Sequence, residues 1–130
     1  MQLVQEARHT IPVQVLHAPL SPLSCLVKYL KENRGLSFAH IAKLLKRSYR
    51  AVWGAYERAK SAPKLMDEVR AEFFLSPNDF VADLSILESV VSHLKDHHGL
   101  TFAVIATLID RDQRTVWTVY DRARKKGDAR

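Results

Sequence analysis

Apolar residues in the segment 113–126 recur every three or four positions, which is the spacing of one face of an α-helix. The apolar side of this segment consists of Val116, Val119, Tyr120 and Ala123. The opposite side carries Arg114, Thr118 and Lys125, flanked by Thr115, Asp121 and Arg122. The pattern therefore predicts an amphipathic helix with one buried side and one largely basic side that faces water.

The chain contains an internal repeat, so the same pattern also occurs 64 residues earlier. Residues 20–62 align with residues 84–126 without a gap, and nearly half of the aligned pairs are identical. The matches fall on apolar positions, on a Gly and on a few polar positions, which indicates a shared fold rather than low complexity. The sequence thus predicts two structural units of one kind in tandem.

Each repeat is predicted to form three helices. They are expected at about residues 21–35, 38–45 and 49–62 in the first repeat and at 85–99, 102–109 and 113–126 in the second. Gly35 and Gly99 end the first helices because Gly readily adopts the left-handed conformation, and Ser37 and Thr101 cap the second helices. A three-residue turn joins the second helix to the third, which is the helix-turn-helix arrangement.

The repeats divide the chain into an N-terminal arm at 1–19, a first repeat at 20–62, an acidic connector at 63–83, a second repeat at 84–126 and a tail at 127–130. We expect an all-α fold with at most one or two very short strands. Residues 11–16 are candidates for one strand, and either 73–75 or 79–81 for its partner across the repeats. The segment 64–74 could equally form a short helix.

The net charge of +6 predicts a surface that attracts polyanions, and the distribution of charge strengthens this expectation. The first repeat has nine Lys and Arg against two Glu, a net charge of +7. The second has seven basic residues against five acidic ones, a net charge of +2, and the connector has two against five, a net charge of −3. The positive charge therefore belongs to the two repeats.

The third helix of the second repeat carries the candidate base-reading residues. A major groove about 12 Å wide admits a helix, and an Arg side chain can form two hydrogen bonds with guanine. Arg114, in the first turn, is predicted to read a base, and Thr118 to contact a thymine methyl group or a phosphate. Arg122, Lys125 and Lys126 are predicted to pair with phosphates, which supplies affinity but little sequence information.

The first repeat carries Arg50 at the position of Arg114, but Gly54 replaces Thr118. We therefore expect the first repeat mainly to grip phosphates and the second to discriminate between sequences. The full candidate DNA-binding set is Arg47, Ser48, Tyr49, Arg50, Gly54 and Arg58 in the first repeat, and Arg111, Asp112, Gln113, Arg114, Thr115, Thr118, Arg122, Lys125 and Lys126 in the second.

Aromatic and histidine residues allow further interpretations. Trp53 and Trp117 lie between the core and exposed faces of the third helices, and we interpret them mainly as braces for the first helix or for the contact between repeats. Contact with sugar or base edges is the alternative. His93 and His97 are four residues apart and His98 is adjacent, but zinc requires a third or fourth ligand. We therefore favour a solvated helix end at this place over a metal site.

No catalytic motif is present in the sequence: it lacks a Ser/His/Asp spacing, a glycine-rich phosphate loop and the zinc-protease pattern. We expect a protein that is not an enzyme, with no cofactor, metal or small-molecule substrate. Cys25 is the only cysteine, so no intramolecular disulfide forms, and it is interpreted as a small core residue. The first residues do not match a signal peptide, and no apolar run is long enough for a membrane span, so we expect a cytoplasmic, nucleoid location.

The segment 100–126 resembles the helix-turn-helix of the fourth region of bacterial sigma factors and of LuxR-type regulators, which share a capped start, an I-A-x-x-L core and a T-V pair. It is more similar to small prokaryotic tandem proteins with the pattern I-A-x-x-L-x-R-D-x-R-T-[IV]-W-T-x-Y-x-R-A. The matching residues are Ile105, Ala106, Arg111, Asp112, Arg114, Thr115, Val116, Trp117, Thr118, Tyr120, Arg122 and Ala123. The first repeat departs from the pattern at Ser48, Tyr49, Ala51 and Gly54. The resemblance implies DNA binding and transcriptional regulation.

The expected function is therefore that of a transcription regulator that binds double-stranded DNA through the third helix of each repeat. Two units in one chain could occupy successive major grooves, about 34 Å apart along one face of the duplex. Homodimer formation remains open. One alternative is a protein-interaction or dimerisation module built on the paired Trp and Tyr residues. Another is a DNA-targeting subunit of a recombinase, transposase or terminase machine.

Overall fold

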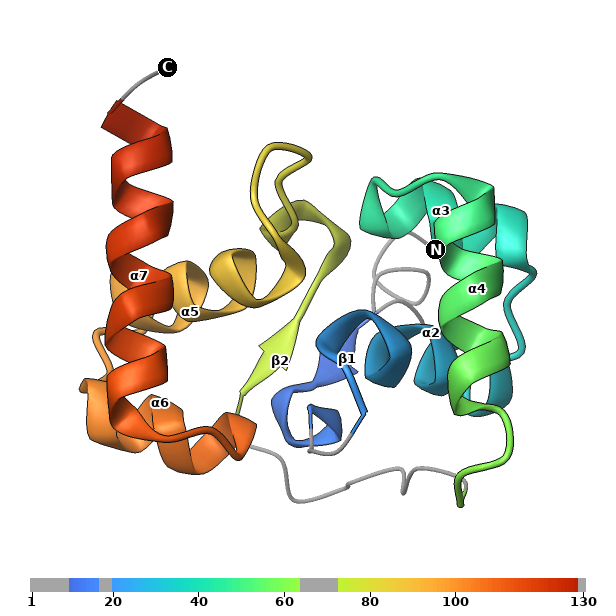
Figure 1. Ribbon diagram of the computed structural model, residues 1–130, viewed down its shortest axis with the longest axis horizontal. Helices are drawn as coiled ribbons and strands as arrows, with labels where there is room; N and C mark the ends of the chain where they lie inside the picture. Colours follow the sequence, from blue (N-terminus) through green and yellow to red (C-terminus); the bar gives the residue numbers. More distant parts are fainter. Residues whose placement is uncertain (1–9, 17–19, 64–72, 129–130) are drawn as a thin grey trace, which may run out of the picture.

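The computed structural model describes residues 10–16, 20–63 and 73–128, and it is mainly helical (Figure 1). The first repeat contains α2 (Pro22–Glu32), α3 (Phe38–Leu45) and α4 (Tyr49–Ala59), and the second contains α5 (Ile86–Asp96), α6 (Phe102–Ile109) and α7 (Gln113–Asp128). The strands β1 (Ile11–Pro12) and β2 (Phe74–Leu75) and the short 3-10 helices η1 (Val13–Val15) and η2 (Pro77–Asp79) precede the two repeats. The predicted all-α class with very short strands is confirmed.

The helices begin where the sequence provides a side-chain acceptor for their free N–H groups. In each case the cap accepts a hydrogen bond from the backbone N–H three residues further on. The caps are Ser21 for α2, Ser37 for α3, Ser48 for α4, Ser85 for α5, Thr101 for α6 and Asp112 for α7. The bounds differ from the prediction mainly at helix ends: the first helices stop about a turn before Gly35 and Gly99, α4 ends at Ala59, and α7 continues to Asp128.

The third helix of each repeat packs against the first, so that α4 lies on α2 and α7 lies on α5. Val52 and Val116, at equivalent positions, are fully buried at these contacts. A tyrosine also joins the two helices in each repeat: Tyr56 Oη donates to Glu32 at 2.9 Å, and Tyr120 Oη donates to Asp96 at 2.6 Å. The orientation of each third helix is therefore fixed by apolar packing and by one polar contact.

The strand before the first repeat pairs with the strand before the second, which is one of the two pairings predicted from the sequence. β1 and β2 are antiparallel, with Ile11 opposite Leu75 and Pro12 opposite Phe74. The Val13 N–H extends the pairing to the Phe73 carbonyl at 3.1 Å. The partner is thus the segment at 73–75, and 79–81 is not a strand. The alternative helix at 64–74 falls largely on residues outside those described.

One hydrophobic core includes residues of both repeats and of the N-terminal arm. Val13 and Leu16 are fully buried, and η1 lies against α6 of the second repeat as well as α2 of the first. Cys25 is buried, as predicted for a core residue. In the described part of the chain, no helix combines the length and the apolar character needed to span a bilayer.

Candidate nucleic-acid interface

The turn between the second and third helices has the three-residue length predicted from the sequence. Lys46 and Asp110 end α3 and α6 in the left-handed conformation, with φ of 57° and 55°. Glycine is the usual residue in this conformation, which a residue with a Cβ rarely adopts. The next residue in each repeat returns its N–H to the helix, from Arg47 to the Ala42 carbonyl and from Arg111 to the Ala106 carbonyl, both at 3.0 Å. The two turns therefore have the same geometry without glycine.

The exposed face of α7 matches the helical-wheel prediction. Val116, Val119 and Ala123 are buried, whereas Arg114 is exposed in the first turn of the helix. Thr118 is half-buried beside it. The remaining exposed candidates on this helix are Gln113, Arg122, Lys125 and Lys126. The helix thus presents a basic side to solvent, and its apolar side faces α5 and α6.

The exposed face of α4 has the same construction with different side chains. Val52, Ala55 and Ala59 are buried, and Arg50 is exposed at the position equivalent to Arg114. The other exposed candidates are Ser48, Tyr49 and Arg58, and Gly54 is half-buried. The predicted placement of the two arginines on open helix faces is therefore confirmed.

Two tryptophans belong to the same faces, and neither of them is a core residue. Trp53 is 48% exposed and Trp117 is 54% exposed, each one turn after the arginine of its helix. On the apolar side of α7, the Tyr120 ring lies 5.5 Å from that of Phe102. A helical wheel could not settle the direction of either indole, because both lie at its border. Their identity in both repeats is the one signal that pointed to them.

A shallow, open depression lies at the start of α7, lined by Phe102, Gln113, Arg114 and Trp117. In the first repeat, Tyr49 stands where the second has Gln113. The Tyr49 ring packs edge-on against Phe38 with centroids 6.2 Å apart. The Tyr49 ring therefore occupies in the first repeat the position that corresponds to the open depression beside Gln113 in the second.

Several candidate residues position the third helices instead of facing outward from them. The half-buried Arg47 donates through Nη2 to the Leu84 carbonyl at 2.7 Å and through Nη1 to the Lys46 carbonyl at 3.1 Å. Arg111 donates through Nη1 to the carbonyls of Asp110 at 3.1 Å and Ile109 at 3.3 Å. Both guanidinium groups thus donate to carbonyls at the end of the preceding helix, and Arg47 also donates to a carbonyl of the second repeat.

The cap of α7 is made by two further candidates, Asp112 and Thr115. The Thr115 N–H donates to Asp112 Oδ1 at 2.8 Å and its hydroxyl donates to Oδ2 at 3.1 Å. These bonds hold the pKa of the Asp112 carboxyl below its usual value. Ser48 plays the equivalent part in α4, where it accepts from the Ala51 N–H at 3.1 Å.

The lysines at the end of α7 differ in their availability. Lys125 is strongly exposed and pairs along the helix with Asp121 at 3.0 Å, a contact of little energetic weight at a surface. Lys126 reaches back to the buried carboxylate of Glu88 at 2.6 Å. Burial pushes the pKa of Glu88 upward, but hydrogen bonds from Lys126 and Ser85 and the charges of Lys126 and Arg122 outweigh it and hold the pKa below its usual value. Lys126 therefore stabilises the fold by pairing with Glu88.

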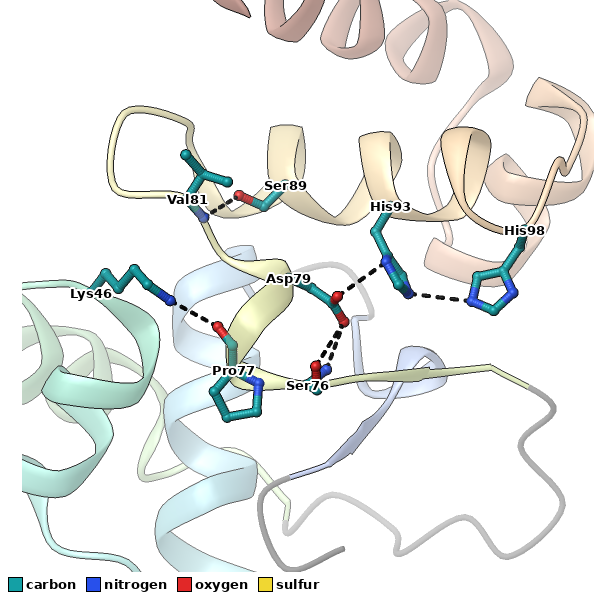
Figure 2. Close-up of polar contacts among 8 residues, drawn as sticks. All are labelled: Lys46, Ser76, Pro77, Asp79, Val81, Ser89, His93 and His98. Atoms are coloured by element: carbon teal, nitrogen blue, oxygen red, sulfur yellow. Dashed lines mark hydrogen bonds and ion pairs between the residues drawn. The ribbon is translucent and has the colours of Figure 1, made fainter. Parts of the chain in front are cut away.

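The histidines do not form a simple solvated helix end, because His93 makes specific contacts (Figure 2). Its Nδ1 lies 3.1 Å from Asp79 Oδ1, and its Nε2 lies 3.2 Å from His98 Nε2. Burial lowers the pKa of His93, and the neighbouring His98 and His97 lower it further against the opposing effect of Asp79. Among the described residues, no three His, Cys, Asp or Glu side chains are arranged to hold a metal ion.

Comparison of the chain with family models, with curated proteins and with solved structures finds no match.

Proposed function

We propose that the chain binds double-stranded DNA as a transcription regulator, with α4 and α7 as its two groove-reading helices. The observation that carries the proposal is the placement of Arg50 and Arg114. Each lies exposed in the first turn of a third helix whose opposite side is buried. Each also follows a short second helix and a tight turn, which is the order of elements that helix-turn-helix proteins use to place a helix in the major groove.

The second repeat supplies the base-reading surface in this proposal. Arg114 is in position for two hydrogen bonds to a guanine, and Thr118 and Gln113 lie on neighbouring parts of the same helix. Arg122 and Lys125 pair with phosphates further along the backbone. Lys126 contributes less than the sequence suggested, because a phosphate would have to compete with the carboxylate of Glu88.

The first repeat supplies most of the electrostatic affinity. It carries the larger net charge, and Gly54 offers no side chain to a base where the second repeat has Thr118. The Tyr49 ring rests on Phe38 and presents an aromatic edge in place of the amide of Gln113. This repeat therefore grips the duplex with less discrimination between sequences than the second.

The proposal is tested by comparing Arg114→Ala with Lys125→Ala on cognate and on random duplex DNA, with the cognate taken from selection out of a random pool. We expect Arg114→Ala to lower cognate affinity about tenfold or more and leave random binding nearly unchanged. Lys125→Ala should weaken both alike and reduce the dependence of log affinity on log salt by about 0.9. Equal losses on both DNAs from both variants would show that the assigned roles are wrong.

Exposed aromatic side chains support a second candidate function, a protein-interaction module. Tyr49, Trp53 and Trp117 are each about half exposed, and Trp and Tyr are enriched among residues that dominate protein interfaces. A gel shift with random duplex fragments at moderate salt separates the candidates. Absence of any retained duplex, together with self-association in sedimentation, would favour the interaction module.

A further inference from the structure

The structural repeat is longer than the three helices, because the short elements before each repeat are also equivalent. η1 spans Val13–Val15 and η2 spans Pro77–Asp79, which are the same positions shifted by 64 residues. The strands that precede them overlap at the equivalent positions Ile11 and Leu75, so each unit runs strand, 3-10 helix and three helices. None of the three residues of η1 is identical to its counterpart in η2.

The strand pair shows how the two units are related in space. Ile11 and Leu75 are equivalent positions, 64 residues apart, and they lie directly opposite each other in an antiparallel ladder. A two-fold axis brings equivalent positions of two copies face to face, whereas a simple translation brings different positions together. The ladder therefore lies on an approximate two-fold axis that passes between Ile11 and Leu75.

Contacts away from the strands obey the same relation. The first helices of the two units, α2 and α5, contact each other. η1 of the first unit lies against α6 of the second. In the reverse direction, Lys46 at the end of α3 donates from Nζ to the Pro77 carbonyl of η2 at 2.8 Å (Figure 2). These contacts between the units are reciprocal, as in a homodimer with a self-complementary interface, although the symmetry is approximate: Arg47 donates to Leu84 of the second unit, whereas the equivalent Arg111 donates to its own turn.

The third helices are placed accordingly. In Figure 1, α4 and α7 lie at opposite ends of the molecule with the strands between them, and they run in opposite directions. α7 crosses in front of α5 and α4 in front of α2, so both third helices lie on the same side of the first helices. Dimeric helix-turn-helix proteins use this arrangement to present two antiparallel recognition helices to one face of a duplex.

We propose that a single chain recognises an imperfect inverted repeat in double-stranded DNA, one half-site for each unit. This rests on the proposed function, and it adds the symmetry of the target and a stoichiometry of one chain per site. The half-sites resemble each other because both third helices present an Arg, a Trp and a second Arg at equivalent positions. They differ because the first two turns of the helices differ at three positions outside the core, which are Tyr49, Ala51 and Gly54 in α4 and Gln113, Thr115 and Thr118 in α7.

Selection of bound sequences from a random duplex pool with the full chain tests the proposal. The expected motif is an inverted repeat with unequal halves whose centres lie about one helical turn apart, bound by one chain as measured by sedimentation. Reversing one half-site to give a direct repeat should lower affinity about tenfold or more. A selected direct repeat, a lone half-site or two chains per site would overturn the inference and leave the proposed function intact. Failure to enrich any duplex would overturn the proposed function itself.

A variant with a more symmetric surface provides a second readout. Tyr49→Gln, Ala51→Thr and Gly54→Thr together give the first two turns of α4 the outer side chains of α7. The structure has room at Gly54, where an added Cβ would lie 3.4 Å from the side chain of Arg58 and in ordinary contact with it. We expect the selected half-sites to become nearly identical, with circular dichroism confirming that the helices are retained. Half-sites that remain as different as those of the natural chain would show that the units do not each read one half.

Discussion

Arg47 joins the two repeats through its guanidinium, and its removal is expected to lower the free energy of unfolding. Nη2 donates at 2.7 Å to the carbonyl of Leu84, a residue that is 8% exposed. A hydrogen bond from a charged group contributes about 1.5–3 kcal/mol, and a buried acceptor left without a donor loses a similar amount. Arg47→Ala should therefore cost about 2 kcal/mol, since part of the vacated space remains open to water.

The matched control is Arg111→Ala at the equivalent position of the second repeat. Among the described residues, Arg111 donates only to carbonyls of its own turn, Ile109 and Asp110. Those contacts join no other element, so the loss should stay below about 1 kcal/mol.

Urea unfolding followed by circular dichroism measures both variants. A cost of about 2 kcal/mol shifts the midpoint by on the order of 1 M for a chain of this size. Equal midpoint shifts for Arg47→Ala and Arg111→Ala would refute the conclusion that the first arginine holds the repeats together. So would an Arg47→Ala midpoint indistinguishable from that of the natural chain.

Three other changes should alter stability in predictable directions. Gly54→Ala should raise stability by about 1 kcal/mol, because Gly54 lies inside α4 with room for a Cβ; an unchanged thermal midpoint would contradict this. Because the pKa of Glu88 is lowered in the folded state, its ionised carboxylate stabilises the fold at pH values above the ordinary pKa of a carboxyl group. This contribution is lost as the pH falls through the lowered pKa. In Lys126→Ala the pKa of Glu88 should rise in NMR titration, because burial is then opposed only by the hydrogen bond from Ser85 and the charge of Arg122. The lowered pKa of His93 makes stability fall as pH drops below about 6.5, and His93→Gln should flatten stability measured between pH 7 and 5.

The helices were predictable because their signals are local. Each begins at a Ser, Thr or Asp whose side chain caps it, and residues such as Val52 and Val116 repeat at the spacing of one helical face. The exposure of Arg50 and Arg114 followed from the same spacing. Local propensity and periodicity agree with the tertiary structure throughout these segments, as they do in chains with consistent sequence signals.

The contacts between the repeats were less predictable because they depend on residues far apart in the chain. Nothing in the run from Lys46 to Ser48 shows that the Arg47 guanidinium reaches the Leu84 carbonyl, so the sequence alone places Arg47 among the DNA-binding candidates. The sequence predicts a solvated helix end at His93, but in the structure the ring of His93 contacts the carboxylate of Asp79 in η2. Trp117 lies at the border of the helical wheel, and the structure leaves about half of its surface exposed. For Arg47 and His93 the deciding partner belongs to another element.

The pairing of Ile11 with Leu75 also has a consequence for the synthesis of the protein on the ribosome. The arm that carries Ile11 and Val13 emerges before the two repeats, but the strand that pairs with it and the helix α6 that covers η1 follow more than 60 and about 90 residues later. Until then the apolar side chains of the arm lack part of their final surroundings, because contacts between such distant segments form only after a long loop closes. The first half of the chain is thus completed by the second, and neither half reaches its native packing alone.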